Sequence, residues 1–471
     1  DGERAAHVRE TARHAVIAEV EIDGRQGVAN GVFYDALEEP SVAAALLEAI
    51  ARKRPLRGEA GDIVPQQTRA FRALRGPADV DLAPVLQRPE VHQHEVVFGR
   101  RMVLRVPRGI VDGVNAELEV GRFLTERASF VNVAPIGGSL EYRAPRKPPV
   151  TLAILQGHVP SEGDAFRFTV DCAQQFFQHA LARAASGDAA PDGGTPVELI
   201  DRDPPPLALE MMAAYIEFAR TLGMRTAELH LALASDAEDP VFAPEDFTML
   251  YQRSLYQSLR NQALRLGVRL REAVPSLPDE VQAEAREVLD AEPRMLRQFG
   301  VLRARRFAVS RIRIHGDLEL AHVLCTGRDV VIADLEAGDR LGATERRLKV
   351  SPLRDVASML WSFHHAVRGG LVGDGSAALV RPGDVDVLQP WAYFFASWAG
   401  SSFLRGYLRC AHDARFVPRT KRDLAALLLI FGLKKCIDEA EHALERRPAW
   451  LRVPLRGISD VLLMADGGRQ R

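Results

Sequence analysis

The sequence predicts an α+β protein, with its strands in the first third of the chain and helices in most of the remainder. Apolar and polar residues alternate at 14–37, 95–107 and 139–156, which is the period of half-buried strands. From residue 170 onward apolar residues recur at spacings of three and four, the period of amphipathic helices. A short strand–turn–strand unit within residues 311–334 interrupts these helices.

Length and composition limit the class of protein. A chain of 471 residues can form two lobes and an additional subdomain. Its net charge of −2 provides no overall field for nucleic acid or an anionic membrane, and we expect neither as a partner. The four cysteines form no CxxC pair, and we find neither a signal peptide nor a membrane-length apolar run. We therefore expect a cytoplasmic protein with reduced thiols and, since the chain begins with Asp1, a piece of a longer one.

The strand-rich part has recognisable turn and cap signals. Residues 40–53 form a helical pattern with Pro40 in its first turn. Residues 95–108 predict a hairpin that turns at Gly99-Arg100. A helix is expected from Asn115 to Thr125, with Asn115 as its cap, and a second hairpin follows it. Further helices are expected at residues 170–186, 206–232, 246–272, 278–299, 352–367, 391–411 and 421–444.

Two carboxylates mark the strand–turn–strand unit. Asp317 follows the strand Arg311–Ile314 within the triplet His-Gly-Asp, and Asp334 ends the next strand. Phosphoryl transfer needs one carboxylate to accept the proton of the attacking hydroxyl and another to hold magnesium. The pattern therefore predicts a bilobal protein-kinase-like fold, with Asp317 as the general base and Asp334 as the Mg²⁺ ligand.

Other candidate site residues surround this pair. Glu336 is a candidate second metal group, with a solvated side chain as the alternative. His322 occupies a metal-ligand position but suits magnesium poorly, and His315 is expected to be structural. Arg105 is the candidate phosphate-holding cation, with Glu119 as its ion partner and an exposed strand arginine as the alternative.

Several motifs resemble those of bacterial maltokinases, including the maltokinase portion of trehalose synthase–maltokinase fusion proteins. The matching segments are ELEVGRFLTER at 117–127, LQGHVPSEGDAF at 155–166, SPLRDVASML at 351–360 and the RP-W element that begins at Arg447. The resemblance as a whole extends from about Val20 to Leu462.

The resemblance implies an aminoglycoside-phosphotransferase-like arrangement of three parts: a partial N-terminal cap at 1–85, a small ATP-binding lobe at 86–160 and a helical C-lobe at 161–471. It also implies ATP- and Mg²⁺-dependent conversion of maltose to maltose 1-phosphate in trehalose and glycogen metabolism, with a trehalose synthase domain or subunit as partner. Gln156 to Val159 would border adenine. Lys435, Glu439 and Arg447 would border the sugar.

The chain also departs from the family's pattern. Arg105 replaces a lysine, Glu319 replaces the loop histidine, and His322 replaces a metal-binding glutamine. The turn at residues 91–95 contains neither glycine nor serine, which makes it a poor phosphate cradle. Two alternatives therefore stay open: a kinase for another sugar, such as an amino sugar, and a degenerate pseudokinase associated with trehalose synthase.

Overall fold

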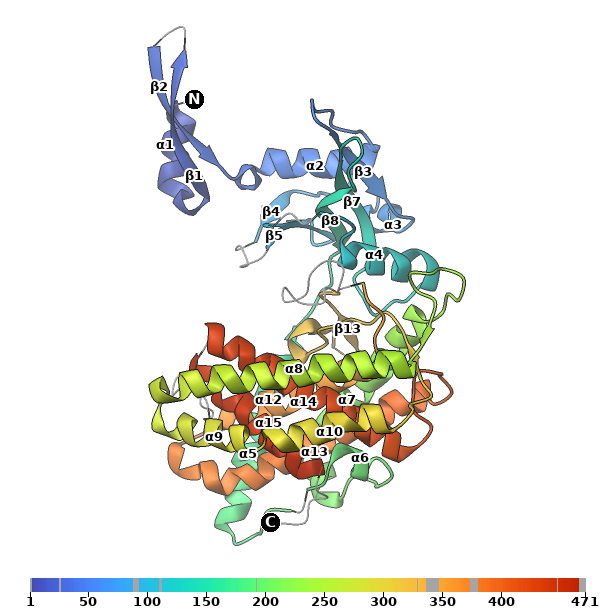
Figure 1. Cartoon of the computed structure of the whole chain (residues 1–471). Coiled ribbons are helices and arrows are strands. Elements are labelled where there is room, and N and C mark those ends of the chain that lie inside the picture. Colours follow the sequence, from blue (N-terminus) through green and yellow to red (C-terminus); the bar gives the residue numbers. More distant parts are fainter. Residues whose placement is uncertain are drawn as a thin grey trace. The chain divides into compact units, whose positions relative to one another are not determined.

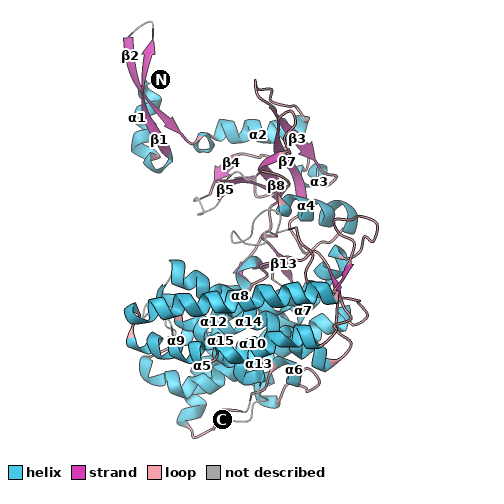
Figure 2. Cartoon of the chain, in the orientation of Figure 1, coloured by secondary structure: helices cyan, strands magenta, loops and turns pink. Residues whose placement is uncertain are grey.

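A computed structural model describes most of the chain, which divides into two compact units, Asp1–Pro160 and Ser161–Arg471 (Figure 1). The described residues are 2–24, 27–87, 93–109, 112–191, 193–327, 329–335, 347–372, 380–446 and 448–465. Strands predominate in the first unit and helices in the second, as the sequence predicts (Figure 2).

A six-stranded antiparallel sheet forms the centre of the first unit, in the order β3-β7-β8-β6-β5-β4. Its strands are β3 (Asp62–Gln67), β4 (Pro84–Leu86), β5 (Gln93–Phe98), β6 (Met102–Pro107), β7 (Ile136–Arg143) and β8 (Val150–Gly157). Two residues with positive φ, Gly99 and Arg100, connect β5 to β6, which confirms the expected hairpin. β3 and β4 come from the stretch that we assigned to the cap, yet they pair in this sheet; the cap boundary stays a prediction.

Helices complete the first unit. α2 (Pro40–Arg52) packs Leu47 and Ile50 into the same core as Phe98 and Leu155 of the sheet. α4 (Ala116–Phe123) begins after Asn115, whose side chain accepts a hydrogen bond from the Leu118 N–H at 2.9 Å, as predicted. α1 (Gly2–Thr11), β1 (Val16–Gly24) and β2 (Gly27–Tyr34) form a small core of their own. α3 (Phe71–Arg75) lies beside β7.

Long helices dominate the second unit. They are α5 (Ala165–Ala185), α6 (Pro196–Leu199), α7 (Pro206–Leu233), α8 (Met249–Ala273), α9 (Asp279–Asp290), α10 (Glu292–Ala304), α12 (Leu353–Val372), α13 (Val385–Ala411), α14 (Lys421–Arg446) and α15 (Arg452–Ala465). α8 and α10 run side by side (Figure 1). The single helix expected at 278–299 is instead two, because Pro293 fits the first turn of a helix but not its interior.

α7 and α13 approach each other at the level of their backbones. A Cβ atom at Gly223 would lie 2.0 Å from the Phe403 carbonyl oxygen, and one at Gly406 would lie 2.1 Å from the Arg220 carbonyl oxygen. Any larger residue at either position would force the two helices apart. This contact fixes two helices that hold part of the site described below.

Two small sheets interrupt the helices of the second unit. β12 (Val323–Cys325) pairs with β13 (Val330–Ile332) and with β9 (Gly163–Asp164). β10 (Glu245–Asp246) pairs with β11 (Ser310–Arg311). The β12–β13 hairpin confirms the turn that was expected between the two candidate carboxylates. Within the described residues, no helix has both the length and the apolar character needed to cross a membrane.

His364 of α12 is expected to make the stability of the fold depend on pH. Burial, together with nearby Arg368, lowers the pKa of His364 from 6.5 to about 4, while Asp460 opposes the shift. Between these two pKa values the unfolded chain binds more protons than the folded chain, so the free energy of unfolding falls as pH drops from about 6.5 to about 4. We expect His364→Gln to weaken this dependence by at most about 1.4 kcal/mol per pH unit. Urea unfolding across this range measures the effect, and an unchanged slope in the variant would exclude His364 as its source.

Candidate active site

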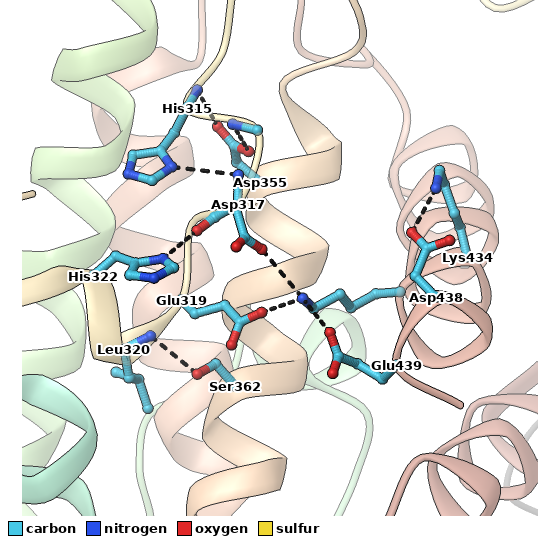
Figure 3. A network of polar contacts seen from close by, with 12 residues as sticks. His315, Asp317, Glu319, Leu320, His322, Asp355, Ser362, Lys434, Asp438 and Glu439 are labelled. Atoms are coloured by element: carbon cyan, nitrogen blue, oxygen red, sulfur yellow. Dashed lines mark hydrogen bonds and ion pairs between the residues drawn. The ribbon is translucent and has the colours of Figure 1, made fainter. Parts of the chain in front are cut away.

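A buried aspartate holds the His-Gly-Asp loop. Asp355, in the first turn of α12, is completely buried. Its Oδ2 accepts a hydrogen bond from the His315 N–H and its Oδ1 accepts one from the Gly316 N–H, both at 2.9 Å (Figure 3). A carboxylate that binds two successive backbone N–H groups fixes the path of the loop immediately before Asp317.

Two further buried side chains hold the Asp355 carboxylate in place. Asp355 Oδ2 lies 3.1 Å from His230 Nε2, and His230 Nδ1 lies 3.0 Å from the Tyr407 hydroxyl. All three side chains are fully buried and come from α12, α7 and α13. If Nε2 donates to the carboxylate, Nδ1 can accept a hydrogen bond from the Tyr407 hydroxyl, so both ring nitrogens have a partner.

Removing this anchor is expected to disorder the loop. Asp355→Ala deletes the acceptor of three hydrogen bonds and leaves two backbone N–H groups and His230 without it. We expect a loss of about 3–5 kcal/mol in the free energy of unfolding, because the bonds are buried and charge-assisted. Urea unfolding measures this. A loss below about 1 kcal/mol, which is what an exposed ion pair contributes, would contradict the anchoring role.

Two histidines hold the other side of the loop. His315 Nε2 lies 2.8 Å from the Ala333 carbonyl oxygen, and burial lowers the pKa of His315. His322 Nδ1 donates to the Asp317 carbonyl oxygen at 2.7 Å, and the two imidazole rings stack with centroids 6.0 Å apart. The structural role expected for His315 agrees with these contacts. His322 uses one ring nitrogen to fix the loop, which leaves only Nε2 for any ligand.

A buried lysine forms ion pairs with three carboxylates, one of which belongs to Asp317. Lys435 of α14 has a side chain only 9% exposed, and its Nζ lies 3.4 Å from Asp317 Oδ1 and 2.9 Å from Glu439 Oε1. It also forms an ion pair with Glu319. Figure 3 shows the three carboxylates converging on one amino group. Burial alone would lower the pKa of Lys435, but the carboxylates of Glu319, Asp317 and Glu439 outweigh it and raise that pKa well above its usual value.

The expected sugar-side residues therefore lie next to the expected base. Lys435 and Glu439 are one helical turn apart on α14, which places both on the side that contacts Asp317. Glu319 joins them from the loop, at the position where the chain departs from the maltokinase pattern. Arg447 was expected here too, but it lies outside the described residues.

Asp334 has an unusual backbone conformation. It follows β13 with a φ of +53°, which is uncommon for a residue other than glycine, although aspartate tolerates it better than most. Such conformations cost free energy and persist mainly at functional sites. Magnesium is often bound by one or two carboxylates, with waters and phosphates as the remaining ligands, so Asp334 fits the expected role. Glu336 lies outside the described residues, within which no three His, Cys, Asp or Glu side chains form a ready-made metal site.

The candidate nucleotide residues lie in the first unit. Arg105 of β6 pairs with Glu95 at 2.8 Å and with Glu117 of α4 at 3.2 Å. Glu117 of α4 is thus one partner of Arg105, and the expected pairing of Arg105 with Glu119 stays a prediction.

The segment expected to border adenine, Gln156 to Val159, begins at the end of β8. Gln156 is buried and pairs with Val103 of β6 and Ile136 of β7, whereas Val159 lies just beyond the strand and is partly exposed. Their proposed contact with adenine stays a prediction. Of the expected phosphate turn, His92 lies outside the described residues, and His94 contacts Asp35 at 3.1 Å.

An aromatic cluster that we did not predict borders the acidic residues. The His365 ring lies 5.6 Å from Phe166, 6.0 Å from Trp361 and 6.0 Å from Trp450, measured between centroids. Burial lowers the pKa of His365, while Glu319 and Glu439 oppose that shift, so the ring lies within electrostatic reach of the acidic cluster. Because its members come from three segments that are distant in sequence, the chain contains no local pattern that reveals the whole cluster.

Solved structures with the same architecture come from kinases. No family model matches the chain. A glucosamine kinase in complex with glucosamine, ADP and inorganic phosphate superposes with a TM-score of 0.60 at 21% sequence identity, covering 96% of this chain and 89% of its own. A second crystal form of glucosamine kinase has a TM-score of 0.58 at 22% identity, covering 94% and 93%. The fold is protein-kinase-like. This confirms the fold class predicted from the two strand-end carboxylates, and the similar structures are those of sugar kinases.

Proposed function

We propose that this chain transfers the γ-phosphoryl group of ATP to a hydroxyl group of a sugar. The observation that carries the proposal is Asp317, which lies on a loop fixed by Asp355 and beside the buried cation Lys435. One carboxylate oxygen of Asp317 contacts Lys435, and the Asp317 side chain is 32% exposed. A carboxylate that is held in place and still accessible is suited to accept a proton from an incoming hydroxyl.

Each residue has a distinct task in this proposal. Asp317 orients the acceptor hydroxyl and takes its proton, while Lys435 keeps the Asp317 side chain in place. Asp334 would hold Mg²⁺, which when bound supplies positive charge to the phosphates of ATP. Arg105 would contribute further charge to the phosphates, and Gln156 and Val159 would border the adenine.

The charge of the acceptor side favours an amino sugar. Three carboxylates, those of Asp317, Glu319 and Glu439, meet at the single ammonium group of Lys435. A site rich in carboxylates attracts an ammonium group more strongly than a neutral hydroxyl. The aromatic cluster around His365 adds apolar surface for a sugar ring.

Maltose is the second candidate acceptor. The long motif matches to maltokinases favour it, and the product would then be maltose 1-phosphate for α-glucan synthesis in the cytoplasm. A trehalose synthase domain or subunit would be the partner that supplies the disaccharide.

A substrate panel tests the proposal. ADP release in the presence of ATP and Mg²⁺ is measured with glucosamine, maltose, glucose and trehalose, together with a thermal shift by ATP and Mg²⁺. We expect a shift and sugar-dependent ADP release, greatest with glucosamine. Glu439→Gln should raise KM for glucosamine more than KM for glucose, because only the former loses a charge pair. Absence of both the thermal shift and ADP release would instead support the pseudokinase alternative.

A further inference from the structure

An arginine of α7 holds the turn of the β12–β13 hairpin. Arg225 Nε donates to Asp329 Oδ1 at 2.9 Å, and Arg225 Nη2 donates to Asp329 Oδ2 at 2.7 Å. Two parallel hydrogen bonds between a guanidinium and a carboxylate fix the orientation of the two groups as well as their distance. Hydrogen bonds to Asp329 and to Glu228 raise the pKa of Arg225, so the guanidinium stays charged.

The Asp329 side chain that Arg225 binds also shapes the turn. Asp329 Oδ1 accepts a hydrogen bond from the Val330 N–H at 2.8 Å. The Asp329 carbonyl oxygen accepts bonds from the N–H and the hydroxyl of Thr326, both at 3.0 Å. Val330 is the first residue of β13. The contact with Arg225 therefore acts directly on the point from which β13 starts.

β13 needs this support because it lies at the edge of its sheet. The strand order is β13-β12-β9, so within the described residues β13 pairs with β12 alone. Just after β13, the Ala333 N–H donates to the His322 carbonyl oxygen at 2.9 Å, and the Ala333 carbonyl oxygen lies 2.8 Å from His315 Nε2. The strand is thus held at its start by α7 and at its end by the segment of the two histidines. Asp334 is the next residue.

The same stretch of α7 also supports the His-Gly-Asp loop. His230 contacts Asp355, which in turn binds the backbone of that loop. About one and a half helical turns separate His230 from Arg225. The close backbone contact between α7 and α13 at Gly223 leaves this part of the helix little freedom to move. α7 is therefore one rigid support for both the loop and the hairpin.

We propose that Arg225 is a positioning residue for phosphoryl transfer: through Asp329 it sets where β13 ends, and thereby where Asp334 lies relative to Asp317. This inference rests on the role proposed above for Asp334 as the Mg²⁺ ligand. The side chains of Arg225 and Asp329 are 27% and 37% exposed, so their ion pair adds little to the overall stability. Its effect lies in the geometry of the site, where a displacement of about 1 Å can lower turnover as much as a hundredfold.

Binding of Mn²⁺ to the protein–ADP complex tests the proposal without turnover. Electron paramagnetic resonance measures the Kd for Mn²⁺, with ADP alone as the blank. We expect Asp334→Asn to raise this Kd at least about tenfold and Arg225→Met to raise it about three- to tenfold. Arg225→Lys keeps the charge but not the two parallel bonds, and should recover only part of that loss. In sugar-dependent ADP release, Arg225→Met should lower kcat about tenfold and leave the KM for the sugar within about a factor of two.

Glu228→Gln is the matched control. Glu228 is the other carboxylate partner of Arg225, at 2.8 Å, and its replacement leaves the contact with Asp329 in place. We expect its Mn²⁺ affinity and kcat to stay close to wild type. Asp329→Asn should reproduce the losses of Arg225→Met, and the double variant should lose no more than either one, because the two side chains act as a pair.

The outcomes separate this inference from the proposed function. Wild-type Mn²⁺ affinity and kcat in Arg225→Met, together with a loss of Mn²⁺ affinity in Asp334→Asn, would overturn the positioning role alone. Additive losses in the double variant would also overturn it, since Arg225 and Asp329 would then act separately. Wild-type Mn²⁺ affinity in Asp334→Asn would overturn both the positioning role and the proposed metal ligand.

Discussion

Replacement of Asp317 by Asn is expected to lower kcat about a hundred- to ten-thousandfold while leaving the affinity for ATP within a factor of about three. The amide keeps the shape of the side chain and can still accept a hydrogen bond from Lys435, but it cannot take the proton of the acceptor hydroxyl. Sugar-dependent ADP release measures kcat, and isothermal titration measures ATP binding.

Asp438→Asn is the matched control for this variant. Asp438 lies on α14 and pairs with Lys434 at 2.6 Å, so it is an aspartate with a lysine partner that we assign no part in catalysis. We expect its kcat to stay close to wild type. Turnover within a factor of three of wild type in Asp317→Asn would refute the assignment of the base.

Replacement of Lys435 by Met should affect both stability and turnover. Three carboxylates would lose the cation that they share, and we expect a loss of about 2–3 kcal/mol in the free energy of unfolding at neutral pH. The pKa of Lys435 is raised above 10.5, so its stabilising charge is fully present at neutral pH and is lost only as pH rises above about 10.5. Turnover should also fall, because Asp317 loses the contact that positions it.

The adjacent lysine provides the control. Among the described residues, Lys434 has one ion-pair partner, Asp438, and burial lowers the pKa of Lys434, so its charge is less favoured than that of Lys435. Lys434→Met should therefore cost less stability and leave turnover unchanged. Urea unfolding and ADP release compare the two variants. Equal losses in both would mean that the carboxylate cluster gives Lys435 no special role.

Local patterns in the sequence were sufficient for most of the fold. The cap at Asn115, the turn at Gly99-Arg100 and most long helices of the second unit follow from signals within a few residues and occur where they were expected. The exceptions are the helix expected at 278–299, which is two helices, and α6 and α15, which were not predicted. The position of Asp317 and Asp334 at strand ends was enough to predict the fold class. These features depend on neighbours in the chain, which a sequence displays directly.

The parts of the site that were not predicted from the sequence depend on contacts between segments that are distant in the chain. Asp355 meets His315 and His230, and each of these contacts joins segments that are distant in sequence. Its signal was an acid in the first turn of a largely apolar helix, which can equally well be a simple helix N-terminal charge. The ion pair of Arg105 with Glu117 depends on the rotation of α4 about its axis, which the spacing of the residues does not fix.

The central claim is that Asp317 serves phosphoryl transfer to a sugar. Its most direct test is ³¹P NMR of the wild-type protein incubated with ATP, Mg²⁺ and an equal mixture of glucosamine and maltose. We predict a new sugar-phosphate resonance that accumulates with ADP, arises mainly from glucosamine, and accumulates at least about a hundredfold more slowly with Asp317→Asn. Resonances of ATP alone, or of ADP and inorganic phosphate without any sugar phosphate, would contradict it.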